Sequence, residues 1–399
     1  MLVDLALTDD SGGHVKCWQR LAEAAADHAA DHADRLDLTV HFSGPAPARI
    51  ELSRSVRYVL LPPVFSSARL VRDVPDHTDL APWHPRLARA LGDYDVIHTT
   101  DAFFCYARTA MRFARSRGVP VVSSIHTNTP EYARITTEKL LERLLGRGRL
   151  YRAASDYLGL PKRVSGLLER RLATHLGMAD TGDGHRHCGI ALRRGIDRAL
   201  FAPGRRDRAW FAQRFGLPPG HLILVYAGKL NAGKNVPLLA PIVAAAREAG
   251  APVHLLCAGA GAEQAALQAA LGPAFTGAGP LAQDELARAY ASADLFLFPS
   301  TIDEWGNAAV EAMASGLPAL LAHGSGVATA MADCAGLRVL PGDDPLPWAA
   351  TIVELAAAPA RRAAMGEAAR AYVEARVPSW GEVVEEDLLP VWRAAAARR

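Results

Sequence analysis

Short β-rich runs alternate with longer helical patterns in two separate series along this chain of 399 residues. In the first series, helical patterns at 14–34 and 106–117 separate predicted strands at 2–8, 36–42, 56–62, 95–99 and 119–125. The second series predicts strands at 222–227, 253–258, 274–276, 295–299, 319–322 and 337–340, with helices at 236–249, 262–271, 283–291, 308–315 and 347–355. This alternation indicates parallel sheets covered by helices on both faces. The sequence therefore predicts an α/β protein with two doubly wound, Rossmann-like domains.

The segment between the two series differs from both. Residues 132–176 are helical without a strand signal, and Gly, Pro and charged residues concentrate between 177 and 206. We therefore expect domains at 1–185 and 186–379, followed by a helical segment at 380–399. Two such domains would face each other across a cleft between their strand ends, which is a default ligand site.

Composition narrows the classes of function. The formal net charge is only +2, which argues against a nucleic-acid partner bound through bulk charge. The five cysteines are scattered without a CxxC pair, as in reduced cytoplasmic proteins. The chain shows no secretory signal pattern and no uncharged apolar run of about 18 residues. A cytoplasmic location is expected.

One segment departs from the overall charge balance. Residues 134–176 hold ten Lys and Arg against four acids, with leucines interleaved among them. Basic amphipathic helices can lie on an anionic membrane, which would make the protein peripheral on the inner face. The alternative is a helical flap whose leucines pack on their own domain.

Residues 295–322 form a strand, a polar loop, a Gly-opened helix and a second strand. Asp303 and Glu311 bracket the loop and helix at the carboxyl edge of the sheet, where open α/β sheets bind ligands. Ionised carboxylates only accept hydrogen bonds, which suits sugar or ribose hydroxyls. Glu304 is the alternative to Asp303 as the working acid. Gly306 and Asn307 open the helix, whose free N–H groups can bind phosphate oxygens.

A second candidate site lies where the strand 222–227 meets the next helix. Gly228 and Lys229 follow the strand, and Lys234 precedes the helix. Two lysines at such a corner can straddle a diphosphate, with help from the helix dipole. The alternative is two solvated surface lysines.

The first domain offers weaker signals. Gly12 and Gly13 follow the first strand and permit close approach of a ligand, or serve only as a turn. His126 ends the strand 119–125, where it can bond a substrate hydroxyl or be satisfied by loop carbonyls.

Metal and dinucleotide sites are poorly supported. Neither the histidines at 28 and 32 nor the cluster at 185–188 has a metal-ligand pattern. No GxGxxG fingerprint occurs at 12–13 or at 258–261. We expect no metal and no cofactor.

Taken together, several motifs resemble one family over nearly the full chain. They are Gly12-Gly13, His126 within SSIHTNTPEYA, RRGIDRALFAP, AGKLNAGKN, ASADLFLFPS and DEWGNAAVEAMASGLP. The chain resembles retaining glycosyltransferases of the glycosyltransferase 4 type, which have the GT-B fold.

The resemblance implies a role for each candidate. Glu311 would hold the ribose hydroxyls and Asp303 the donor sugar, as the family's E-x7-E pair does with a Glu in the first place. Lys229 and Lys234 would neutralise the diphosphate, and His126 would bind the donor sugar near the reacting carbon. Gly12, Gly13 and His14 would border the acceptor and the phosphates. The family pattern also makes 1–185 the acceptor domain, 186–379 the donor domain, and 380–399 a helix that crosses back to the first domain.

The implied activity is transfer of a sugar, with retention, from a UDP- or GDP-linked donor to a hydroxyl of a lipid or cell-envelope acceptor. The nucleotide sugar would be a co-substrate, and the reaction would need no metal. An alternative is the same chemistry on a soluble small molecule. A remote alternative is a two-lobed Rossmann oxidoreductase or ligand-binding protein.

Overall fold

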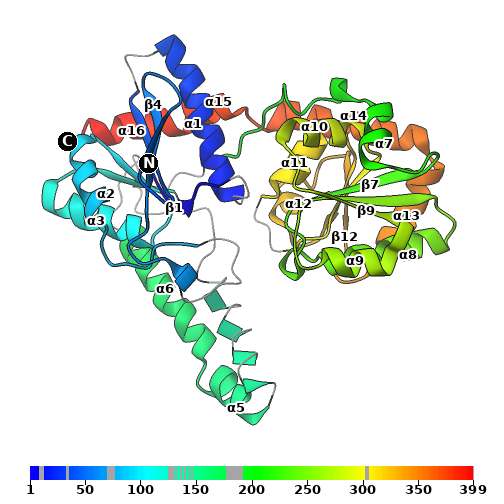
Figure 1. Ribbon diagram of the computed structural model, residues 1–399, viewed down its shortest axis with the longest axis horizontal. Helices are drawn as coiled ribbons and strands as arrows, with labels where there is room; N and C mark the ends of the chain where they lie inside the picture. The colour runs from blue at the N-terminus through cyan, green and yellow to red at the C-terminus, as the bar shows by residue number, and fades with distance from the viewer. Residues whose placement is uncertain are drawn as a thin grey trace. The chain divides into compact units, whose positions relative to one another are not determined.

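The computed structural model describes most of the chain in two compact units. The described residues are 1–8, 13–32, 36–69, 77–124, 130, 133–134, 137–138, 141–142, 145–146, 148–176, 192–301 and 305–398, with the backbone alone at 28–32 and 176. One unit comprises Met1–Arg193 and Trp380–Arg399, and the other Arg194–Ser379 (Figure 1). The boundary predicted at 185/186 falls within 177–191, outside the described residues.

The first unit contains a six-stranded sheet in the order β3-β4-β2-β1-β5-β6. Five strands are parallel, and β3 pairs antiparallel with β4 at one edge. The strands are β1 (Leu2–Ala6), β2 (Leu38–Ser43), β3 (Ala48–Glu51), β4 (Val56–Leu61), β5 (Ile97–Thr99) and β6 (Val121–Ser123). All four residues of β3 are exposed, so this edge strand lacks the buried apolar positions by which the other strands were predicted.

Helices cover both faces of this sheet. Successive side chains of a strand point to opposite faces, and here they belong to two different hydrophobic cores. Val3 and Val122 pack with Trp18 of α1, whereas Leu2 and Val121 belong to a second core. The helices are α1 (Gly13–His32), α2 (Pro85–Ala90), α3 (Cys105–Arg117), α5 (Arg149–Arg152), α6 (Leu160–Leu176), α15 (Trp380–Glu382) and α16 (Leu389–Ala396).

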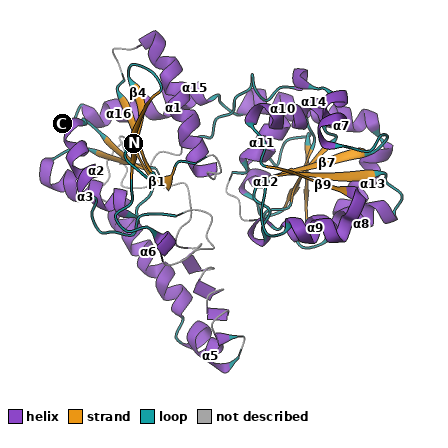
Figure 2. Cartoon of the chain, in the orientation of Figure 1, coloured by secondary structure: helices purple, strands orange, loops and turns teal. Residues whose placement is uncertain are grey.

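The chain's last helices complete the first of these cores. Val383, Leu388 and Trp392 are buried against α1 and the sheet. The segment that follows Trp380 therefore packs with the first unit (Figure 2).

The second unit contains an all-parallel sheet in the order β12-β11-β10-β7-β8-β9. Numbered within the unit, this is the 3-2-1-4-5-6 order of a Rossmann domain. The strands are β7 (Leu222–Ala227), β8 (Val253–Ala258), β9 (Phe275–Gly279), β10 (Leu295–Phe298), β11 (Ala319–Ala322) and β12 (Leu337–Leu340). The helices are α7 (Arg208–Phe215), α8 (Leu239–Glu248), α9 (Gln264–Leu271), α10 (Gln283–Ser292), α11 (Asn307–Ala314), α12 (Gly326–Ala330), α13 (Pro345–Ala357) and α14 (Pro359–Arg376). The predicted pair of Rossmann-like domains is confirmed.

The predicted helical segment 132–176 includes a projection from the first unit. In Figure 1, α6 runs away from the sheet and α5 lies at its far end. Among the described residues, no helix is both long enough and apolar enough to cross a bilayer.

Candidate nucleotide-sugar site

The second sheet reverses its strand order between β7 and β10, which lie side by side. In open α/β sheets, ligands bind outside the carboxyl ends of the strands at such a switch point. Gly228 and Lys229 follow β7 directly, and Pro299 to Thr301 follow β10. The predicted lysine corner therefore lies at this edge.

The turn that carries Lys229 is fixed through its backbone. Gly228 N donates to Ala258 O at 2.9 Å, and the hydroxyl of Tyr226 donates to Lys229 O at 3.0 Å. A Cβ atom on Gly259 would lie only 1.9 Å from Gly228 O, so the turns after β7 and β8 can meet only because this residue is glycine. The backbone of Lys229 is therefore held in place before any ligand binds.

Two asparagines that the sequence analysis did not select hold the second half of the corner. The side-chain oxygen of Asn231 accepts from Lys234 N at 3.0 Å. Asn235 has a left-handed backbone with φ 56°, and its amide donates to Pro299 O at 3.1 Å and Gly342 O at 2.7 Å. These bonds connect the lysine corner to the loops after β10 and β12.

The start of α11 lies after β10. Gly306 has φ 67°, and a Cβ atom there would approach Val327 Cγ1 to 2.9 Å and Phe298 Cζ to 3.0 Å. Only glycine therefore suits this N-cap. Asn307 is the first residue of the helix, and Glu311 follows one turn later.

Glu311 has a tyrosine neighbour that the sequence analysis missed. Tyr290 is fully buried, and its hydroxyl has no hydrogen-bond partner within the part of the chain that the structure describes. Burial, and then the negative charge of Glu311, hold the pKa of Tyr290 well above its ordinary value. The phenol therefore stays protonated and can act as a donor beside this carboxylate.

In the first unit, β1 and β5 form the corresponding switch point. Gly13 begins α1, and His14 Nε2 lies 3.4 Å from Thr100 Oγ1, just beyond the end of β5. The hydroxyl of Thr100 donates to Leu2 O at 3.0 Å. His14 thus lies at the carboxyl edge of the first sheet.

Two buried acids, Asp4 and Asp79, and the half-buried Asp101 organise the loops at this edge, and the sequence analysis did not single them out. Asp4 accepts from Tyr106 N at 2.9 Å and from Asp79 N at 3.2 Å. Burial, and then the neighbouring Asp101, raise the pKa of Asp4 well above its ordinary value. Asp79 accepts from Val64 N at 2.7 Å among other amides. Among the described side chains, no group of three His, Cys, Asp or Glu could hold a metal ion.

Comparisons with known proteins place this architecture in a family. A family model described as Glycosyl transferases group 1 matches residues 221–358, and one described as Glycosyltransferase Family 4 matches residues 12–176. A D-inositol 3-phosphate glycosyltransferase from Catenulispora acidiphila is 30% identical over 77% of this chain and 74% of its own length. The chain belongs to the family 4 glycosyltransferases.

Two further glycosyltransferase comparisons support the assignment. A GDP-mannose-dependent alpha-mannosyltransferase from Mycolicibacterium smegmatis is 30% identical over 77% of this chain and 75% of its own length. The crystal structure of Anabaena HepE in complex with UDP and glucose superposes with a TM-score of 0.63, at 15% identity over 96% of each chain. This structural likeness supports the GT-B fold of the chain.

Not all of the predicted site residues can be placed in this glycosyltransferase. Six of these residues lie in the second unit, at or just beyond the carboxyl ends of β7 and β10: Gly228, Lys229, Lys234, Gly306, Asn307 and Glu311. Two others, Gly13 and His14, lie at the edge of the first sheet. Their predicted roles remain predictions. The predictions for Gly12, His126, Asp303 and Glu304 fall outside the described residues.

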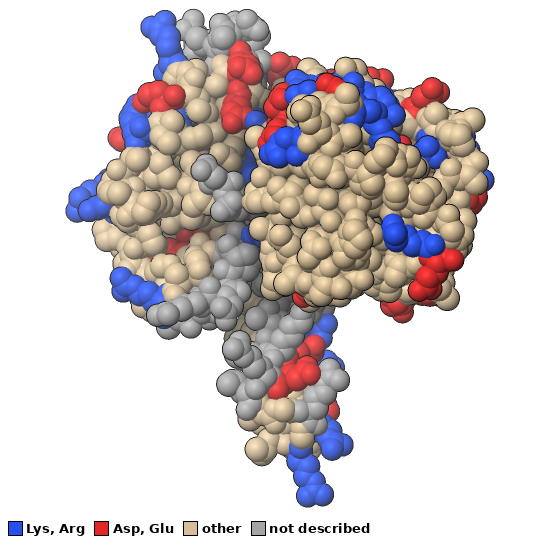
Figure 3. Space-filling model, turned by 45° about the vertical axis from the view of Figure 1, so that its right-hand side comes forward, with Lys and Arg blue, Asp and Glu red and all other residues tan. Residues whose placement is uncertain are grey.

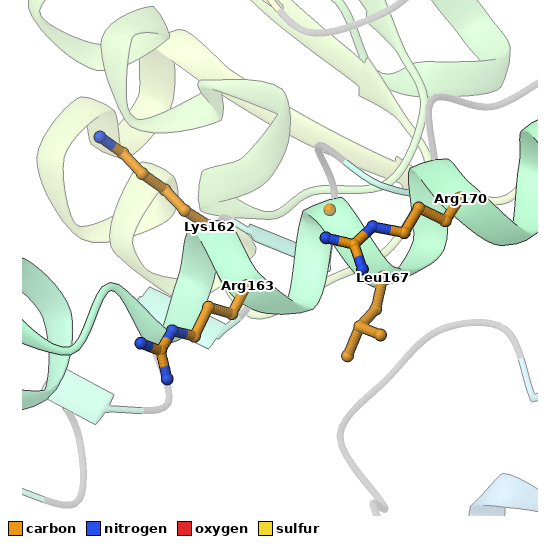
Figure 4. A pocket seen from close by; sticks show the side chains of 5 residues that line it. Lys162, Arg163, Leu167 and Arg170 are labelled. Carbon is orange, nitrogen blue, oxygen red and sulfur yellow. The ribbon is translucent and has the colours of Figure 1, made fainter.

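The projecting helices of the enzyme expose apolar side chains next to basic ones. Leu150, Tyr157 and Leu167 are 69%, 91% and 61% exposed. Lys162, Arg163, Leu167 and Arg170 line an open groove of about 500 Å³ on α6 (Figure 4). Lys and Arg also gather toward the tip of the projection in Figure 3.

Proposed function

We propose that this glycosyltransferase moves a sugar, with retained anomeric configuration and without a metal, from a UDP- or GDP-linked donor to a hydroxyl of a lipid or cell-envelope acceptor. The observation that carries the proposal is the preorganised corner after β7, where Lys229 and Lys234 meet the switch point of the sheet. One relative is named GDP-mannose-dependent, and HepE was crystallised with UDP and glucose, which supports a nucleotide-sugar donor here.

The proposed chemistry follows from the charges at this edge. Lys229, Lys234 and the free N–H groups of α11 would stabilise the diphosphate as it leaves. Glu311 would accept hydrogen bonds from the ribose hydroxyls, with Asp303 or Glu304 for the sugar and His126 near the reacting carbon. The leaving phosphate would take the acceptor's proton, so no nucleophilic carboxylate and no metal would be needed.

A thermal-shift panel of UDP-, GDP- and ADP-sugars tests the donor site. A ligand at 100 times its Kd stabilises by about 2.7 kcal/mol, which gives a clear shift for the correct donor. Exchanging both lysines in Lys229→Met plus Lys234→Met should abolish that shift. The matched control is Arg361→Met plus Arg376→Met, which removes two surface cations from α14 and should leave the shift intact. A wild-type chain that responds to no nucleotide sugar would refute the proposal.

The proposal of a lipid acceptor rests on the projection. Apolar side chains that are more than half exposed, beside basic ones, suit the interface of an anionic membrane, where each Lys or Arg contributes about 1 kcal/mol. The enzyme would then be cytoplasmic and peripheral on the inner membrane face. The alternative, a soluble small-molecule acceptor, is supported by relatives that are named for D-inositol 3-phosphate.

Co-sedimentation with vesicles separates the two acceptor classes. We expect the chain to bind vesicles that contain phosphatidylglycerol, and Leu150→Ser plus Tyr157→Ser to weaken that binding. Leu346→Ser is the matched control, because Leu346 is 64% exposed in the second unit and should not matter. Absence of binding to anionic vesicles would favour the soluble acceptor.

A further inference from the structure

A buried tyrosine at the switch point of the second sheet carries a polar group that the fold leaves unbonded. Tyr290 lies in the last turn of α10 and is fully buried. Its hydroxyl has no hydrogen-bond partner among the residues that the structure describes. A buried donor without a partner destabilises the fold, and most buried polar side chains in proteins have one. The unbonded phenol therefore needs an explanation.

The ring of Tyr290 is fixed by its neighbours, so its hydroxyl cannot reach a distant partner. The ring packs edge-on against Phe296 at a centroid distance of 5.6 Å, and the ring of Phe201 lies at 6.1 Å. Phe296 lies in β10 and pairs with Val225 of β7, where the strand order of the sheet reverses. The phenol is therefore held beside the two strands whose carboxyl ends carry the candidate site.

The functional group that this phenol can serve is the carboxylate of Glu311. The helices α10 and α11 pack on each other, and Val310, which precedes Glu311, lies in the same core as Tyr290. Burial, and then the charge of Glu311, raise the pKa of Tyr290, so the carboxylate is close enough to act on the phenol. Tyr290 is buried and Glu311 is half-buried, so any effect on a ligand passes through Glu311.

A carboxylate that binds a ribose also needs a donor on its inner side. It has about four positions that accept a hydrogen bond, and the ribose hydroxyls fill only those that face the ligand. A bound nucleotide excludes water from the half-buried Glu311, which makes an unfilled position costly. An O–H group that comes from the core can fill such a position.

We propose that Tyr290 is a positioning residue of the nucleotide site, whose hydroxyl donates to the carboxylate of Glu311 when a ribose binds. The proposal rests on the proposed function, in which Glu311 accepts from the ribose hydroxyls. The bond holds the carboxylate in one orientation, so that the ribose hydroxyls meet their acceptors. The hydroxyl that lacks a partner in the free enzyme gains one in the complex, and Tyr290 itself touches no ligand.

The substitution Tyr290→Phe removes only the hydroxyl, and its effect on the free chain is the first test. Because an unpaired buried donor is removed and no bond is lost, the Tm of the free variant should rise by about 2–4 °C. The matched control is Tyr372→Phe in the same unit, where the hydroxyl donates to Asp333 Oδ1 at 2.7 Å. That variant loses a bond, so its Tm should not rise. A lower Tm in Tyr290→Phe would show that the hydroxyl already has a partner, and would overturn the proposal.

Calorimetric titration with UDP and GDP measures the effect on binding. The nucleotide that the wild type prefers should bind Tyr290→Phe about tenfold more weakly, the factor that a hydrogen bond to a charged group is worth. The 2′,3′-dideoxy analogue of that nucleotide should bind the wild type and Tyr290→Phe equally, because it offers Glu311 no hydroxyl. Tyr372→Phe should bind both nucleotides as the wild type does.

A double-mutant cycle tests whether the effect passes through Glu311. In a chain that carries Glu311→Ala, the further change Tyr290→Phe should weaken binding by less than about twofold, because no carboxylate remains to be held. Equal affinity of the wild type and Tyr290→Phe for the ribonucleotide would overturn the positioning role. An equal loss of affinity for the ribonucleotide and its dideoxy analogue would overturn it as well. A wild-type chain that binds neither UDP nor GDP would instead overturn the proposed function, and this proposal with it.

Discussion

Replacement of Gly306 by alanine tests whether the start of α11 is built as tightly as the structure shows. Gly306 has φ 67°, a left-handed conformation that costs a residue with a Cβ atom about 1–2 kcal/mol. The new methyl group would also meet Val327 Cγ1 at 2.9 Å and Phe298 Cζ at 3.0 Å. Overpacking of this kind costs about 1–3 kcal/mol. We therefore expect Gly306→Ala to lose about 2–5 kcal/mol of unfolding free energy.

Two other glycines of the second unit separate the contributions. Gly220 has φ 73°, and a methyl group there would meet no atom within 4 Å, so Gly220→Ala measures the backbone strain alone. Gly204 has neither a positive φ nor a close neighbour, so Gly204→Ala should change stability by less than about 0.5 kcal/mol. The expected order of loss is Gly306, then Gly220, then Gly204.

Differential scanning calorimetry measures this order. For a domain of this size, 1 kcal/mol lowers Tm by about 2–4 °C, so Gly306→Ala should lose at least about 4 °C. The same variant should bind the nucleotide sugar more weakly, because the first N–H groups of α11 move with residue 306. If Gly306→Ala loses no more unfolding free energy than Gly220→Ala, then Val327 and Phe298 move aside without cost, and the steric part of the reasoning is wrong.

Two further predictions concern polar groups that hold the sheet edges. Asn235→Ala should lose about 2–3 kcal/mol in urea unfolding, because the bonds to two carbonyls and the tolerance of φ 56° are lost together. Asn235→Gly loses the bonds without the strain, so it should be the milder variant, and the opposite order would contradict this account. His175 Nε2 lies 3.1 Å from Thr99 Oγ1 and 3.0 Å from Ser123 Oγ, at the ends of β5 and β6. Burial lowers the pKa of His175 to about 4, so the unfolded chain takes up this proton below about pH 6.5 and the folded chain does not. The unfolding free energy should therefore fall by about 2 kcal/mol from this group as the pH falls from about 7 to 5. In His175→Asn, the unfolding free energy from urea titrations should fall by that much less over the same range. The same dependence on pH in the wild type and the variant would rule the account out.

The regular elements could be predicted wherever burial leaves a continuous apolar run or an apolar period in the sequence. All residues of β7 and β8 are buried, and both strands have the predicted bounds. By contrast, β3 is fully exposed, and it was missed for that reason. The helix α14 was also missed, because its alanines and arginines form only a weak apolar stripe.

The residues of the candidate site also differ in how far the sequence could predict them. Gly228, Lys229 and Gly306 could be selected because their residue types suit only a few tasks at a strand end: close backbone approach, a left-handed cap, or a cation for an anionic ligand. Asn235 has the same importance for the geometry of the corner, but its partners are two carbonyls that follow β10 and β12. No local pattern identifies those carbonyls before the order of the strands is known.

The hydrogen bond that Trp392 Nε1 in α16 donates to His98 Nδ1 in β5, at 3.0 Å, shows the same dependence on distant residues within the first unit. His98 is an ordinary polar residue in a strand of three residues, and Trp392 is an ordinary apolar residue of an amphipathic helix. The period of the sequence predicts that Trp392 is buried, but its N–H must still find an acceptor, since an unpaired buried donor costs about 1–3 kcal/mol. That acceptor lies 294 positions earlier in the chain. A buried side chain with one polar atom therefore restricts which packings of α16 on the first sheet are stable.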